Sequence, residues 1–263
     1  MLCAAVIALA HVPALAQDKP APGPEIESLI KRLEESGALD AAIERGIQRY
    51  IQKQNEARAK QEEERQRRQI DLAKNARPVD PARDRIHGKL DAAVSVIVYT
   101  DLECPYCKRF AGVPEQSIVK YGDRANVVFR HYPLDFHGDN ARLGAALAEC
   151  VGRQAGSKAF FAFMNDWFRQ TVSNGKGLQR GESQAREMAA SAGAKKWPAI
   201  EKCAKDPAVA QLVQDDMADG IRSGINGTPG TIVRNNRSGY TVAVSGAVPQ
   251  EQLEQAIAKA LAN

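Results

Sequence analysis

Apolar residues recur every three or four positions near the start of the chain, a spacing that predicts two amphipathic helices separated at Gly37. The apolar stripes consist of Ile26, Leu29, Ile30 and Leu33, and then of Leu39, Ile43, Ile47, Tyr50 and Ile51. Residues 52–69 are almost wholly polar but are strong helix formers, so we expect a solvated helical stalk. Stripes this narrow must pack on the rest of the chain or on copies of themselves. We favour a dimer or trimer, because the stalk separates the stripes from the rest.

Short runs of β-branched residues alternate with helical patterns after the stalk. The predicted strands are residues 94–99, 125–131, 231–233 and 240–245. The predicted helices are residues 107–120, 141–154, 157–169, 183–192, 207–222 and 250–261. The order β-α-β, helical block, β-β-α predicts a thioredoxin-like α/β fold that is interrupted by a helical insertion at about residues 137–222.

Composition narrows the class of protein without identifying it. The chain has 263 residues, of which 44% are apolar and 26% charged, and these fractions exclude a collagen, a low-complexity chain and a wholly disordered chain. A formal charge of +4, from 36 basic and 32 acidic residues, is too weak a bias to indicate nucleic-acid binding.

The first sixteen residues have the character of a targeting segment. Residues 1–16 are uncharged and largely apolar and end in Ala14-Leu15-Ala16, which predicts a secretory signal peptide that is cleaved after Ala16. A frayed apolar N-terminus is the alternative. No other segment is apolar over the length that a bilayer requires, so we expect no membrane insertion after cleavage.

Four cysteines remain once Cys3, in the predicted signal peptide, is set aside: Cys104, Cys107, Cys150 and Cys203. In an exported chain they favour disulfides over metal binding, and three pairings are possible. The close spacing of Cys104 and Cys107 makes their pairing the simplest solution and leaves Cys150 with Cys203. That second bridge would close a loop of about 50 residues and stabilise the fold by roughly 4 kcal/mol. Two buried free thiols are the alternative there, and a zinc site would need a second close pair of ligands.

The segment Cys104-Pro105-Tyr106-Cys107 lies where a predicted strand ends and a helix begins. Unpaired N–H groups and the helix dipole at that position stabilise a thiolate, so we expect Cys104 to be the nucleophile of disulfide exchange. Cys107, one turn deeper, would attack the mixed disulfide and release the substrate. Pro105 suits a first helical turn because it has no N–H to satisfy. The two thiols could also bind Cu(I), and no cofactor is expected.

Three motifs together resemble the DsbA-like branch of thioredoxin-fold disulfide oxidoreductases: TDLECPYCKRF, FRHYPL and GINGTPGTIV. Within that branch the chain is most similar to the suppressor-of-copper-sensitivity protein C (ScsC) group, whose members can carry an N-terminal helical oligomerisation segment. The resemblance extends from Arg85 to the C-terminus. It implies that Pro229 is a cis-proline packed against the active-site cysteines and that Thr228 helps to bind the substrate backbone. Val98 stands where many relatives have a buried glutamate, six residues before the first cysteine.

The motif and the resemblance predict a periplasmic thiol–disulfide oxidoreductase that acts on protein substrates, with isomerase or reductase activity slightly favoured over oxidase activity. A membrane redox partner is expected to recycle the Cys104–Cys107 pair. The alternatives are a DsbA-type dithiol oxidase and an oligomeric copper-sequestering or client-binding protein on the same fold. The expected organisation is a signal peptide at 1–16, a linker at 17–24, the oligomerisation segment and stalk at 25–76, and the catalytic domain at 77–263.

Overall fold

The computed structural model describes residues 23–263, so the predicted signal peptide at 1–16 and most of the predicted linker at 17–24 lie outside the described residues. Within the described part the chain divides into two compact units, with the boundary between residues 62 and 63. None of the helices in residues 23–263 combines the length and the apolar character that crossing a bilayer requires.

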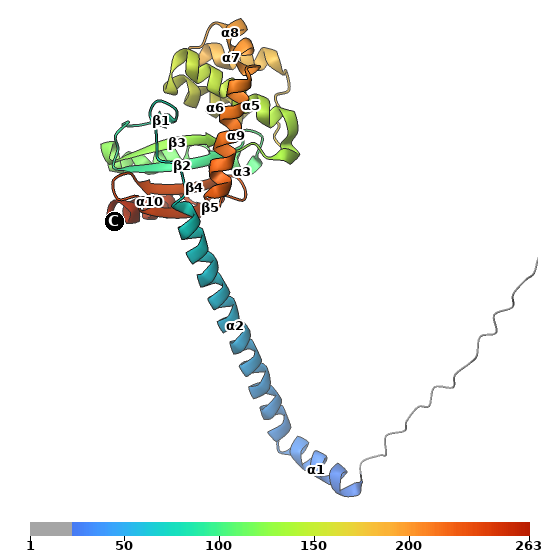
Figure 1. The fold of residues 1–263 in the computed structure, drawn as a ribbon. Coiled ribbons are helices and arrows are strands. Elements are labelled where there is room, and N and C mark those ends of the chain that lie inside the picture. The colour runs from blue at the N-terminus through green and yellow to red at the C-terminus, as the bar shows by residue number, and fades with distance from the viewer. Residues whose placement is uncertain (1–22) are drawn as a thin grey trace, which may run out of the picture. The chain divides into compact units, whose positions relative to one another are not determined.

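Two helices begin the described chain (Figure 1): α1 at Pro24–Glu35 and α2 at Ala38–Ala73. They are separated at Gly37, whose φ of +66° costs glycine little because glycine has no Cβ atom. All nine apolar residues of the two stripes are exposed, by 40% to 65%. The stripes therefore have no apolar cover within their own unit.

Five strands form one mixed sheet in the second unit, in the order β1-β3-β2-β4-β5. The strands are β1 Arg85–His87, β2 Val94–Thr100, β3 Ala125–His131, β4 Gly230–Asn235 and β5 Thr241–Ser245. Central β2 runs parallel to β3 and antiparallel to β4, and both edge strands pair antiparallel with their neighbours. This is a thioredoxin-like sheet, as the sequence predicts.

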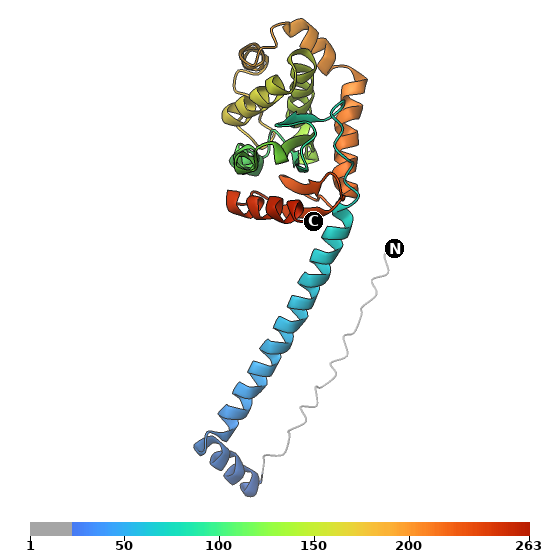
Figure 2. The ribbon, with the colours of Figure 1, turned by 90° about the vertical axis from the view of Figure 1, so that its left-hand side faces the viewer.

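Successive residues of β2 belong to two separate apolar cores, because neighbouring side chains of a strand point to opposite faces of the sheet. Val98 belongs to the same core as Leu253 of α10 (Gln250–Leu261), the red helix that lies along the sheet in Figures 1 and 2. Ile97 belongs to the other core, together with Ala73 at the end of α2. The last turn of α2 is therefore part of the second unit's packing.

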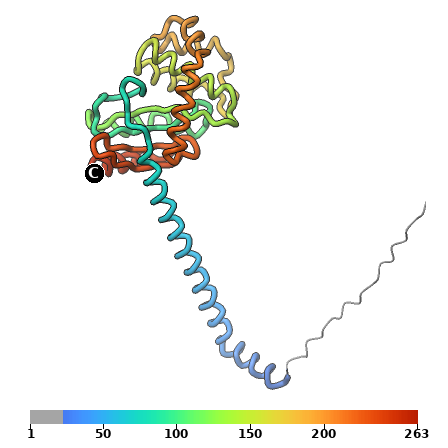
Figure 3. The backbone as a smooth tube through the Cα atoms, viewed as in Figure 1, coloured from blue at the N-terminus to red at the C-terminus, as the bar shows by residue number. Residues whose placement is uncertain are grey.

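A block of helices separates β3 from β4 along the chain, and Figure 3 traces its path. Its helices are α5 Gly138–Ala155, α6 Ser157–Gln170, α7 Glu182–Ser191, α8 Trp197–Ala204 and α9 Pro207–Arg222. A disulfide joins Cys150 of α5 to Cys203 of α8, with the two Cα atoms 5.8 Å apart. Phe160 and Phe163 of α6 are fully buried, so they are packing residues of this block.

The structure departs from the sequence-based elements at three places. The helix expected over residues 107–120 is interrupted, because α3 ends at Phe110 and Gly112 takes a φ of +83° before α4 (Val113–Ile118) and the 3-10 helix η1 (Val119–Arg124). Neither α8 nor β1 is indicated by the sequence pattern. Eight and three residues are too few for a helical or strand period to show clearly.

A fully buried arginine holds the loop after α2 to the sheet. Arg130 of β3 donates to the two carboxylate oxygens of Asp84, at 3.2 and 3.1 Å, and to Oδ2 of Asp219 at 2.7 Å. It also donates to the backbone carbonyls of Arg77 and Pro78. Burial opposes ionisation of Asp84, yet the Arg130 guanidinium keeps the pKa of that carboxyl below its ordinary value. The buried guanidinium of Arg130 and the buried carboxylates of Asp84 and Asp219 therefore compensate one another's charge.

Replacing Arg130 by methionine should destabilise the fold by about 3–5 kcal/mol, because the buried carboxylates of Asp84 and Asp219 would lose their fully buried counter-charge and keep only the more exposed Arg77 and Arg222. Urea unfolding followed by circular dichroism would measure the change. The control is Arg153→Met at an exposed position of α5, where we expect a loss below about 0.5 kcal/mol. Equal effects of the two substitutions would contradict the role of this network.

Candidate active site

The segment Cys104-Pro105-Tyr106-Cys107 carries the chain from β2 into α3 (Pro105–Phe110). Cys104 is the N-cap residue of α3, with extended backbone angles, and Pro105 lies in its first turn. The N–H of Cys104 donates to the carbonyl of Asp101 at 3.1 Å. Both cysteines are buried free thiols, whereas Tyr106 is 55% exposed. Both cysteines thus lie at the start of α3. The side chain of Tyr106, which stands between them in the sequence, faces solvent.

The two thiols differ sharply in acidity. A hydrogen bond from the Cys107 thiol, opposed by burial and assisted by Thr228 and by backbone N–H groups, lowers the pKa of Cys104 from 9.0 to about 6. Burial raises the pKa of Cys107 well above its ordinary value. Cys104 is therefore mainly a thiolate near neutral pH, while Cys107 stays protonated. α3 has only six residues, and the groups that stabilise the thiolate are local ones: the Cys107 thiol, Thr228 and backbone N–H groups.

The loop before β4 lies against Cys104. Its Thr228–Pro229 peptide bond is cis, and the Cys104 thiol donates to the carbonyl of Thr228 at 3.4 Å. The Thr228 hydroxyl oxygen is buried and has no other hydrogen-bond partner in the described chain, so it is available to the Cys104 thiolate. The carbonyl of Pro229 accepts the N–H of Gly246 at 2.9 Å, and Gly230 pairs with Tyr99 of β2. These contacts fix the loop beside the end of β2.

The side chain of Asp101 stabilises the turn that precedes Cys104. Its Oδ1 accepts the N–H of Glu103 at 2.7 Å, and its Oδ2 accepts the N–H of Leu134 at 2.8 Å. The same Oδ2 lies 2.7 Å from Nδ1 of His137, at the end of the 3-10 helix η2 (Asp135–His137). Sequence reasoning missed this pair because Asp101 and His137 are far apart along the chain and form no spacing pattern.

Glu103 connects the active-site turn to the helical insertion. Its wholly buried carboxylate accepts the indole N–H of Trp167, the hydroxyl of Thr171 and the N–H of Gly177, at 2.9, 2.7 and 2.8 Å. The backbone carbonyl of Glu103 also accepts the N–H of Asn174 at 2.7 Å. A glutamate next to a cysteine is usually solvated, so no signal in the sequence pointed to this role.

The structure brings four sequence-predicted site residues together: Cys104, Cys107, Thr228 and Pro229. The Cys150–Cys203 bridge lies apart from them, in the helical insertion. Val98, at the position where many relatives have a glutamate, is fully buried in the apolar core. Among residues 23–263 there is no group of three or more His, Cys, Asp or Glu side chains that could hold a metal ion.

A protein-family model described as thioredoxin matches residues 81–259. The chain belongs to the thioredoxin family. Among solved structures of similar fold, DsbA2 of Pseudomonas aeruginosa is 31% identical, with a TM-score of 0.59 over 68% of this chain and 94% of that one. ScsC of Proteus mirabilis matches through its catalytic domain, at 23% identity and a TM-score of 0.56 over 75% of this chain and 99% of that one. A linker-deletion mutant of the same ScsC matches at 20% identity and a TM-score of 0.55, over 93% of this chain and 99% of that one.

Curated relatives of this thioredoxin-family chain include a much longer protein. Na(+)/H(+) antiporter NhaA 1 of Mycolicibacterium gilvum is 27% identical over 170 residues, which are 61% of this chain and 25% of the antiporter. The chain thus spans about a quarter of the length of the curated relatives that it matches. The neighbours that match over nearly their whole length include DsbA2 and the catalytic domain of ScsC.

The acidity of Cys104 predicts a pH dependence of the reduced protein. Alkylation of Cys104 by iodoacetamide should rise with a midpoint near pH 6 and level off above it, since only the thiolate reacts. Cys107→Ala should move the midpoint to higher pH, because the Cys107 thiol contributes most to lowering the pKa. Thiolate absorbance at 240 nm gives an independent measurement, with Cys104→Ser as the control that should show no transition there. A midpoint near pH 9 in the unmodified protein would contradict this site.

Proposed function

We propose that the protein is a thiol–disulfide oxidoreductase of the ScsC group that acts on protein disulfides in the periplasm. The observation that carries the proposal is the contrast within one active site between a Cys104 thiol whose pKa is about 6 and a Cys107 thiol whose pKa is raised. The Cys150–Cys203 bridge supports an oxidising compartment, because disulfides persist there and are rare in the cytosol.

The chemistry follows from the placement of the two sulfurs. The Cys104 thiolate attacks one sulfur of a client disulfide, forms a mixed disulfide, and expels the other client sulfur as a thiolate that takes up a proton. Thr228 lies beside the reacting sulfur, where its backbone can align an extended client segment. Cys107 then loses its proton, attacks Cys104 and releases the second client thiol. The client is reduced by two electrons and the Cys104–Cys107 pair becomes a disulfide, which a membrane redox partner reduces again.

The acidity of Cys104 favours isomerase or reductase activity over oxidase activity. A pKa of about 6 lies closer to the value of about 7 in thioredoxin than to about 3.5 in the oxidase DsbA. A strongly stabilised thiolate makes the reduced form more stable and the disulfide more oxidising. The weaker stabilisation here leaves the disulfide less oxidising, which suits a protein that cycles in its reduced form. A DsbA-type dithiol oxidase is the alternative.

Two assays separate these activities. The reduced protein should reduce insulin and should restore native pairing in a scrambled multi-disulfide substrate, while Cys104→Ser should lower both to the uncatalysed background because the nucleophile is lost. Cys107→Ser serves as the matched control, since it keeps the nucleophile and should trap clients as mixed disulfides. Rapid oxidation of a reduced substrate without recovery of the scrambled one would instead favour the oxidase.

We also propose that the N-terminal helices join copies of the chain as a dimer or trimer. The stripe on α1 and α2 exposes nine large apolar side chains, and exposed patches of this extent usually mark an interface. Several active sites around a shared core would suit clients with more than one disulfide. The N-terminal segment at 25–76 would then set the assembly, and the domain at 77–263 would carry the chemistry.

Charges placed in the stripe should dissociate the assembly. Ile43→Lys combined with Ile47→Lys should reduce the solution mass from two or three chains to one, because the ammonium groups would be desolvated at the interface. Ala41→Lys combined with Gln48→Lys adds the same charge on the opposite side of α2 and should leave the mass unchanged. Light scattering after size exclusion measures both. A monomeric unmodified protein, or equal dissociation by both pairs, would contradict the interface.

The competing proposal is an oligomeric copper-sequestering or client-binding protein that retains the fold. Two cysteine sulfurs suit Cu(I), and Cys104 and Cys107 are both free thiols. Under this alternative, insulin reduction by the unmodified protein would be near zero, and client binding would survive Cys107→Ser without a mixed disulfide. The thiolate at Cys104 favours the enzyme, because copper binding alone does not require two such different thiols.

A further inference from the structure

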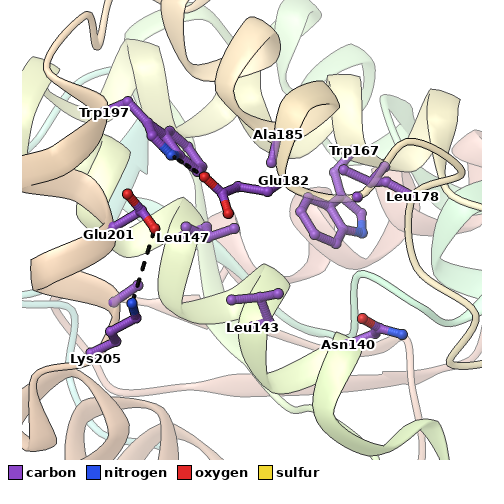
Figure 4. A pocket seen from close by; sticks show the side chains of 12 residues that line it. Asn140, Leu143, Leu147, Trp167, Leu178, Glu182, Ala185, Trp197, Glu201 and Lys205 are labelled. Carbon is purple, nitrogen blue, oxygen red and sulfur yellow. Dashed lines mark hydrogen bonds and ion pairs between the residues drawn. The ribbon is translucent and has the colours of Figure 1, made fainter.

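We infer that the helical insertion holds a second binding site, for a ligand with an apolar body and a cationic head. The site is a cavity of about 250 Å³ between α5, α6, α7 and α8 (Figure 4). Its principal lining residues are Leu143, Leu147, Trp167, Glu182, Trp197 and Glu201. The lining includes neither active-site cysteine and no residue of the Thr228–Pro229 loop. The inference is therefore independent of the proposed redox function.

The walls of the cavity are mainly apolar, and two tryptophans are packed within them. Leu143 is 47% exposed at the opening, and the two tryptophans are almost wholly covered. Both indole N–H groups are already used, since Trp167 donates to Glu103 at 2.9 Å and Trp197 donates to Glu182 at 3.0 Å. The tryptophans therefore offer a ligand no further hydrogen bond and, with 2% and 5% of their surface exposed, little ring area.

The charged groups of the cavity favour a cation. In Figure 4 the carboxylate of Glu182 stands between the two tryptophans, and only one of its oxygens has a hydrogen-bond partner among residues 23–263. Glu201 lies 4.0 Å from the ammonium group of Lys205, whose side chain is 80% exposed. Two carboxylates and one ammonium group leave one net negative charge. A carboxylate beside an apolar cavity can pair with the cationic head of a ligand, while Leu143 and Leu147 contact its apolar body.

The same groups argue against other ligands. An anion would lie against the carboxylate of Glu182, and a neutral apolar molecule would leave that carboxylate without a charged partner. The Cys150–Cys203 bridge holds α8, which carries Trp197 and Glu201, against α5. The walls are thus in place before a ligand arrives, which lowers the cost of ordering them on binding.

Benzyltrimethylammonium is a suitable probe, because it combines an aromatic body with a fixed positive charge. The chain has two tryptophans, and both line the cavity, so tryptophan emission reports on this site directly. We expect a saturable change in emission with a Kd of about 1 mM or lower, confirmed by calorimetry, and binding of neutral benzyl alcohol that is at least about tenfold weaker. No saturable change up to about ten times that concentration, or equal binding of the two probes, would overturn the inference.

Matched variants test which carboxylate is responsible for binding the cationic probe. Glu182→Gln keeps an acceptor for Trp197 but removes the charge, and should weaken binding about tenfold. Glu187→Gln removes the same charge from an exposed position of the same helix and should leave binding unchanged. Leu143→Lys, at an exposed wall position, is a second variant that should abolish binding without disturbing the core. Equal weakening by Glu182→Gln and Glu187→Gln would overturn the site.

A lysine-containing tripeptide with flanking leucines distinguishes the source of the cation. Tighter binding of the tripeptide than of benzyltrimethylammonium supports a polypeptide side chain as the occupant, and the reverse supports a small organic cation. Cys104→Ser should bind the probe as the unmodified protein does, because the active-site sulfur is not part of the lining. Failure of this site would therefore leave the redox proposal untouched.

Discussion

The hydrogen bond from the Cys107 thiol to the Cys104 sulfur is the interaction on which the reactivity of the site depends. It contributes most to the acidity of Cys104, and it exists only while Cys107 keeps its proton. Burial of Cys107 ensures that it does so. The Cys104 thiol is thus acidic because the Cys107 thiol is a poor acid. In the proposed mechanism, Cys107 becomes a nucleophile only after Cys104 has entered the mixed disulfide and its negative charge has disappeared.

The two sulfurs must be held in fixed positions for this hydrogen bond to form. Contacts with three other parts of the chain hold them there. Asp101 closes the turn before Cys104 and accepts the N–H of Leu134. Glu103 binds donors from α6 and from the loop after it. Thr228 approaches from the loop before β4. Because Glu103 and Cys104 are adjacent, a shift of the helical insertion would be transmitted directly to the nucleophile.

The fold could be predicted from the sequence because its signals are local. Runs of β-branched residues and helical patterns marked the long elements, and the Cys104–Cys107 spacing at a strand-to-helix junction predicted a redox pair. The supporting residues could not be predicted in this way. Asp101, Glu103 and His137 are ordinary polar residues in the sequence, and their roles arise only when the tertiary fold removes water from them. The break at Gly112 was also hidden, since the apolar spacing continues across it.

The end of α2 is locked to the loop that carries Thr228. Asn75 donates to the carbonyl of Arg222 at 3.1 Å, Gln69 donates to Ser245 at 3.3 Å, and a Cβ on Gly224 would lie 3.0 Å from Leu72. The last turn of α2 and the loop that carries Thr228 are thus packed as one unit. A change in the last turn of α2 would therefore reach the Cys104 sulfur through Gly224 and Thr228.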